Sequence, residues 1–116
     1  MEFNFLDSKN LNKTWIFDLD GTLVKHNGYL FKNEEILPGV IDFFKKNIKN
    51  DDYVLILTAR DIHYKNQTEL FLKENNIKFN KILYNLPTGE RILFNDKKES
   101  GLKTAYSINL ERNKGL

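Results

Sequence analysis

Hydrophobic positions along the chain follow two spacings, and these spacings predict the secondary structure. Some are continuous apolar runs of about four to eight residues, which is typical of buried strands. Others recur every three or four residues, as they do on one face of a helix. We predict strands over 14–17, 53–57, 77–84 and 91–94 and helices over 34–47 and 61–75. This alternation of strands with helices predicts an α/β domain with a mostly parallel sheet.

Two further segments carry local signals. The segment from Val24 to Phe31 contains His26-Asn27-Gly28-Tyr29, and Asn-Gly between apolar residues predicts a hairpin turn because both residues tolerate a positive φ. The pattern over 102–110 predicts an ordered element but leaves its type open.

Composition narrows the class of protein. The 116 residues predict one domain spanning 1–116, with 18 basic and 16 acidic residues that nearly cancel to +2. This balance argues against disorder and against nucleic acid as a partner. The absence of Cys excludes disulfide scaffolds, thiolate zinc sites and Cys nucleophiles. No apolar run reaches the roughly 18 residues of a membrane span, and residues 1–12 lack a secretory pattern. We therefore expect a cytoplasmic protein with no membrane partner.

Polar residues follow several of the predicted strands. Asp18 and Asp20 follow the first strand, Thr58 follows the second and Asp96 follows a later one. Ligands bind at the carboxyl ends of strands in such sheets. Side chains two residues apart on a strand point the same way, so we expect the first two carboxylates to converge, with Gly21 allowing a sharp turn. Three neighbouring carboxylates repel one another, which predicts a hard cation such as Mg²⁺ that also binds substrate phosphate.

The string Phe17-Asp18-Leu19-Asp20-Gly21-Thr22-Leu23-Val24 makes this interpretation specific. It resembles the first motif of the haloacid dehalogenase superfamily of phosphotransferases, D-x-D-G-T-[LV] after a hydrophobic strand. The segment 55–60 resembles the second motif, an apolar strand ending in Ser or Thr, and 92–96 resembles the fourth, an apolar strand ending in acid. The resemblance covers residues 14 to 110.

The resemblance implies a Rossmann-like three-layer sandwich and a role for each matched residue. Asp18 would be the nucleophile that forms an aspartyl-phosphate, and Asp20 would be the general acid and base. Mg²⁺ would be held by the Asp18 carboxylate, the backbone carbonyl of Asp20 and Asp96. Thr58 would hydrogen-bond the phosphoryl group. Phosphatases and mutases of this superfamily keep an acid at the position of Asp20, so the resemblance predicts a phosphatase rather than a dehalogenase.

The chain departs from the superfamily pattern at the third motif. Related small members place Lys-Pro just before the fourth strand, whereas this chain has Leu86-Pro87. Lys98 is the favoured substitute because it follows Asp96 closely, whereas Arg91 is expected at the far end of its strand. The fourth motif is also reduced, with one acid where relatives often have two. The candidates for the phosphate-binding cation are Lys98, Lys97, Arg91 and Arg60.

The resemblance also suggests a substrate class. Residues 92–115 resemble small bacterial phosphatase-like proteins associated with capsule or surface-carbohydrate synthesis, which favours a sugar phosphate. Each of the two intervals in which relatives insert a cap domain spans only 37 residues, so we expect no cap, an open site and a homo-oligomer that covers it. Three alternatives remain: a phosphatase acting on a nucleic-acid end or a phosphoprotein, a receiver-like signalling module, and a catalytically silent binding subunit.

Overall fold

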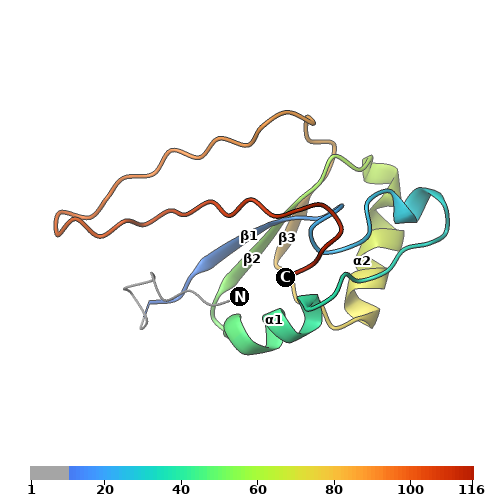
Figure 1. Cartoon of the computed structure of the whole chain (residues 1–116), viewed down its shortest axis with the longest axis horizontal. Coiled ribbons are helices and arrows are strands. Elements are labelled where there is room, and N and C mark those ends of the chain that lie inside the picture. The colour runs from blue at the N-terminus through green and yellow to red at the C-terminus, as the bar shows by residue number, and fades with distance from the viewer. Residues whose placement is uncertain (1–10) are drawn as a thin grey trace.

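The computed structural model describes residues 11–116, and a three-stranded parallel sheet lies at its centre (Figure 1). The strands are β1 (Thr14–Asp18), β2 (Tyr53–Leu57) and β3 (Lys81–Leu83), in the spatial order β1-β2-β3. The predicted α/β class with a parallel sheet is therefore confirmed, with β2 in the middle, as its apolar residues on both faces indicate. The third strand is shorter than the predicted 77–84.

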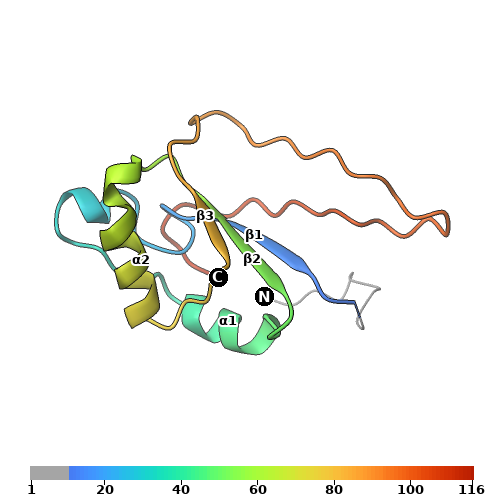
Figure 2. The same cartoon turned by 180° about the vertical axis from the view of Figure 1, so that it is seen from behind.

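Two α-helices cover one face of this sheet (Figures 1 and 2). They are α1 (Val40–Asn47) and α2 (Lys65–Glu74), the latter preceded by the 3-10 helix η2 (Ile62–Tyr64). Right-handed crossovers that step in one direction, from β1 to β2 to β3, place both helices on the same side. The described residues thus form two layers, helices on a sheet, and do not show the expected third layer.

Aromatic side chains hold α1 against β1. The Phe17 ring stacks on Phe44 with centroids 4.9 Å apart and meets the edge of Phe43 at 6.2 Å. Trp15 meets Phe43 edge-on at 5.8 Å. The rest of the core joins the strands to both helices through the buried residues Leu19, Leu23, Val24, Leu37, Val40, Val54, Ile56, Leu72, Ile77 and Ile82.

The segment 34–47 begins its helix later than predicted. Residues 34–39 instead pair with the loop after β1: Val24 and Ile36 form an antiparallel bridge. Gly39 then takes a positive φ of 79° at the N-cap of α1, where a side chain would collide with the backbone of Leu116. The helix therefore starts at Val40.

The predicted hairpin over Val24–Phe31 is a wider loop. Asn27 adopts the left-handed conformation that Asn-Gly predicts, with φ 58°. It is followed by the 3-10 helix η1 (Gly28–Leu30), and the chain pairs with Val24 only when it reaches Ile36.

Residues 86–110, called the arm below, extend away from the sheet on the side opposite the helices (Figures 1 and 2). The predicted strand over 91–94 is wrong, because these residues have no partner strand in the described part of the chain and Ile92, Leu93 and Phe94 are exposed. The segment 102–110 likewise forms neither helix nor strand. The two runs of the arm meet only near its tip, where Lys97 and Lys103 form a bridge.

No helix in the described residues is long and apolar enough to cross a membrane.

Candidate active site

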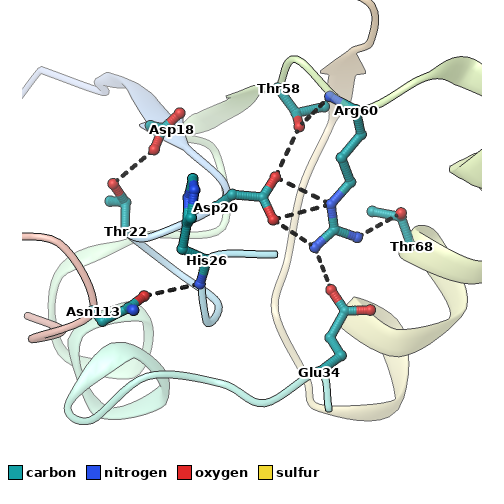
Figure 3. Close-up of polar contacts among 9 residues, drawn as sticks. All are labelled: Asp18, Asp20, Thr22, His26, Glu34, Thr58, Arg60, Thr68 and Asn113. Carbon is teal, nitrogen blue, oxygen red and sulfur yellow. Dashed lines mark hydrogen bonds and ion pairs between the residues drawn. The ribbon is translucent and has the colours of Figure 1, made fainter. Parts of the chain in front are cut away.

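Polar residues from the carboxyl ends of β1 and β2 come together, as the sequence predicts (Figure 3). The register pairs Asp18, the last residue of β1, with Leu57, the last residue of β2. Thr58 therefore follows directly beside the segment that carries Asp20, and its hydroxyl lies 3.3 Å from the Asp20 carboxylate. These two strand ends form the base of the candidate site.

A tight turn fixes the loop after β1. The backbone carbonyl of Leu19 accepts hydrogen bonds from the N–H groups of Thr22, Leu23 and Val24. Gly21 takes a positive φ of 88°, which confirms the prediction that it allows the sharp turn. A Cβ at this position would lie 3.1 Å from Arg112 Cγ, so the C-terminal segment packs directly against the turn.

Asp18 is the accessible carboxylate of the site. Its side chain is 38% exposed, and Thr22 Oγ1 donates a hydrogen bond to Asp18 Oδ2 at 2.9 Å. Arg91 Nη1 donates to Asp18 Oδ1 at 2.6 Å. The expectation that Arg91 lies at the far end of the sheet is therefore wrong, because residues 91–94 form no sheet strand and the arm brings Arg91 to the carboxyl end of β1.

Asp20 faces the opposite way and is bound by Arg60 (Figure 3). Arg60 Nε lies 3.3 Å from Asp20 Oδ1 and 3.1 Å from Oδ2, and Nη2 donates to Oδ1 at 3.0 Å. The two carboxylates thus do not converge. The reason is that β1 ends at Asp18, so the strand geometry that would align residues 18 and 20 does not continue through the turn.

Arg60 is the most enclosed charge of the site, with none of its side chain exposed. Besides Asp20, its Nη2 donates to the Glu34 carboxylate, and its Nη1 donates to Thr68 Oγ1 of α2 at 2.9 Å. The guanidinium also lies 4.0 Å from the centre of the Tyr29 ring, a cation–π contact. Arg60 therefore joins four segments of the chain, and its side chain is enclosed by these groups.

The charges around Arg60 also affect ionisation. Burial acts to lower the pKa of Arg60, but hydrogen bonds to Asp20 and Glu34 outweigh it, so the pKa is raised and the cation is retained. Burial, followed by the nearby negative charge of Asp20, raises the pKa of Tyr29. Arg60 thus stays charged and Tyr29 stays neutral under physiological conditions.

Thr58 is also buried, and its hydroxyl is already engaged. It accepts a hydrogen bond from the backbone N–H of Arg60 at 3.0 Å and lies within donating distance of Asp20. In this arrangement the hydroxyl orients Asp20. Its predicted contact with a phosphoryl group stays a prediction.

Asp96 and Lys98 lie on the arm and are exposed. The backbone carbonyl of Asp96 accepts from Thr104, and the Lys98 N–H donates to the carbonyl of Leu102 at the arm's tip. Within residues 11–116, no three His, Asp or Glu side chains are grouped to hold a metal ion. The predicted Mg²⁺ site uses two carboxylates, Asp18 and Asp96, and the backbone carbonyl of Asp20, so it stays a prediction.

A hollow of about 670 Å³ lies between β1 and the arm. Asp18 and Thr22 line it, and so do the apolar side chains of Trp15 and Leu93. Its lining also includes basic residues from both sides, namely Lys13, Lys98 and Lys103. A hollow of this size is in the range that small-molecule ligands occupy.

Sequence reasoning did not find three of the residues that surround Arg60. Thr68 carried a usable signal, since it is a polar residue on the buried side of a helix, eight positions after Arg60. Glu34 and Tyr29 carried none, because both lie in the irregular segment between β1 and α1.

Comparisons of this chain with protein-family models, with curated proteins and with solved structures found no match.

Proposed function

We propose that this chain is a phosphomonoester hydrolase of the haloacid dehalogenase type and that it acts on a small sugar phosphate. The observation that carries the proposal is the state of Asp18, a half-exposed carboxylate at a strand end with one oxygen bound by Thr22 and the other by Arg91. The motif in which Asp18 lies supports the same chemistry.

The proposed reaction has two steps. An oxygen of Asp18 attacks phosphorus, the bond from phosphorus to the substrate oxygen breaks, and Asp20, protonated from solvent once it has left Arg60, gives this proton to that oxygen. Water then attacks the aspartyl-phosphate, its proton passes to Asp20, the bond from the Asp18 oxygen to phosphorus breaks and inorganic phosphate leaves. Asp20 releases the proton to solvent as it returns to Arg60. Both steps need Asp20 to turn from Arg60 towards the reacting atoms.

Arg91 supplies the cation that the sequence lacks at the third motif. A guanidinium binds phosphate oxygens with paired hydrogen bonds. In the absence of substrate it pairs with Asp18, and a bound phosphate would take over this contact and free the carboxylate oxygen for attack. Arg91 takes the role that the sequence assigned to Lys98, because it is the basic residue in contact with Asp18.

The hollow beside Asp18 supports the proposal that the substrate is small and anionic. Its volume suits a sugar phosphate, and the lysines in its lining would attract the negative charge. The proposal keeps Mg²⁺ as the cofactor that the sequence predicts, but no step is assigned to it, because no three acidic or His side chains of residues 11–116 are grouped around a metal position.

The test is hydrolysis of p-nitrophenyl phosphate and of a panel of sugar phosphates, each with Mg²⁺ and with EDTA. We expect turnover by the wild type and a loss of at least about a hundredfold in Asp18→Asn, because covalent catalysis then lacks its nucleophile. Asp42→Asn is the matched control, since Asp42 is an exposed carboxylate on α1 whose partner is Lys46. Full turnover by Asp18→Asn would contradict the assignment.

A second candidate function is a silent binding subunit, favoured by the position of Asp96 on the exposed arm, next to the Lys97–Lys103 bridge. It predicts that the wild type binds inorganic phosphate in calorimetry but hydrolyses nothing in the panel. Including a 5′-phosphorylated oligonucleotide and a phosphopeptide tests the alternative of a macromolecular substrate. If only these two substrates are hydrolysed, the substrate is a macromolecular phosphate and not a sugar phosphate.

A further inference from the structure

Two carboxylates share one buried guanidinium. Nη2 of Arg60 donates to both Asp20 and Glu34, and the three side chains are nearly or fully enclosed, with 16%, 11% and 0% of Asp20, Glu34 and Arg60 exposed. The cluster carries a net charge of −1. A single carboxylate would balance Arg60, so the second one requires an explanation.

Both oxygens of the Asp20 carboxylate are engaged in this arrangement. Its Oδ1 accepts from Nε and Nη2 of Arg60, and its Oδ2 accepts from Arg60 Nε and from Thr58 Oγ1. The single Nε hydrogen is shared between the two oxygens, so three donors engage both oxygens of the carboxylate. Asp20 must therefore leave Arg60 before it can exchange a proton with a substrate.

Such a departure would ordinarily be costly. Removing one partner of a buried ion pair leaves an uncompensated charge, which is strongly unfavourable. Glu34 would remove this problem, because it also accepts from Arg60 and would keep the guanidinium paired when Asp20 turns away. Thr68 and the Tyr29 ring also hold the guanidinium in place from two other sides.

We propose that Arg60 is a positioning residue that holds Asp20 between turnovers, and that Glu34 is the counter-charge that allows Asp20 to leave Arg60 during the reaction. This inference rests on the proposed function, since it assigns Asp20 to proton transfer. It changes the role of Arg60, which the sequence predicted to bind the substrate and which here binds the general acid Asp20.

Glu34→Gln tests the counter-charge, because it keeps the shape and one acceptor oxygen but removes the charge. Arg60 then binds Asp20 more tightly, and only reactions that need Asp20 should slow. We expect the single-turnover rate of leaving-group release to fall about tenfold for an alkyl phosphate, whose leaving group needs a proton, and less than about twofold for p-nitrophenyl phosphate, whose leaving group does not. The later hydrolysis of the aspartyl-phosphate needs Asp20 for both substrates, so it is kept out of this comparison. The KM values should change little.

A purely structural role for Glu34 would lower both rates equally, and that outcome would overturn the inference. Glu35→Gln makes the same chemical change on the adjacent exposed residue and serves as the control. Glu34→Asp keeps the charge and should restore most of the alkyl phosphate rate. Circular dichroism of each variant shows whether it is folded at the assay temperature.

A second measurement separates this inference from the proposed function. Thermal unfolding of Asp20→Asn, Glu34→Gln and Arg60→Met, alone and in pairs, measures how strongly each carboxylate is coupled to Arg60. We expect the losses in Tm to be non-additive for both pairs that include Arg60. Additive losses for Glu34 and Arg60 would overturn the inference even if the wild type is an active phosphatase. Coupling without any turnover would contradict the proposed function alone.

Discussion

The two aspartates of the site are each paired with an arginine, and the two pairs differ in nearly every other respect. Asp20 and Arg60 are enclosed by β2, α2 and the segment before α1, with no part of the arginine side chain exposed. Asp18 and Arg91 are each more than a third exposed, and Arg91 comes from the arm. One pair belongs to the core of the domain and the other lies at its surface.

The difference shows how one turn of chain can give two carboxylates unlike properties. Asp20 is held by two buried residues, Arg60 and Thr58, and the surrounding protein replaces most of the water around it. Asp18 has two partners, one of which is a solvated arginine that a ligand could displace. Under the proposed function, this geometry suits an enclosed proton-transfer group beside an accessible nucleophile.

Replacing each arginine by methionine should give the largest difference between the two pairs, measured as the loss of unfolding free energy. Arg60→Met leaves Asp20 and Glu34 buried without their cation and should lower the free energy of unfolding by about 3–5 kcal/mol. Arg91→Met removes an exposed pair that water and salt already weaken, and should cost less than about 1 kcal/mol. Urea unfolding of both variants measures this contrast. Equal losses would show that the two pairs do not differ in the way the burial indicates.

Phosphate binding should depend on the surface pair. Arg91→Met removes a charged hydrogen-bond donor and should raise the inhibition constant of inorganic phosphate about tenfold. The affinity of the wild type should fall as NaCl is raised, since exposed charges are screened. Lys98→Met should give a smaller increase than Arg91→Met. A larger effect at Lys98 would return the phosphate-binding role to the residue favoured by the sequence.

Removing the threonine hydroxyl next to each pair should give the smallest difference in stability between the two regions. Thr68→Val leaves a buried N–H of Arg60 unpaired and should cost about 1–2 kcal/mol of stability. Thr22→Val removes a hydrogen bond to the half-exposed Asp18, where water can substitute, and should change stability by less than about 0.5 kcal/mol. Chemical denaturation measures both, and a larger loss at Thr22 would reverse the comparison.

The parts of the molecule that follow local rules could be predicted from the sequence. The apolar runs ending at Phe17 and Leu57 form parallel strands, and the rule that polar groups gather at strand ends placed Asp18, Asp20 and Thr58 in one region. Gly21 makes the turn for which its missing side chain is suited.

The positions of Arg91 and Glu34 could not be predicted, because they depend on contacts between segments that are distant in the sequence. Residues 91–94 have a strand-like composition, but a strand forms only where a partner strand is available, and none lies beside them in the described part of the chain. The path of the arm therefore decided that Arg91, rather than Lys98, contacts Asp18. Glu34 reaches Arg60 from an irregular segment whose course no periodicity encodes.

The origin of Arg91 on the arm also has a consequence for the timing of events at the site. Segments without regular structure move in nanoseconds to microseconds, whereas a fully enclosed ion pair opens only through rarer local unfolding. We therefore expect Asp18 to be uncovered and covered again many times for each departure of Asp20 from Arg60. On this timescale a substrate would meet an open nucleophile almost as soon as it arrives, and the slower event would be the release of the proton-transfer group.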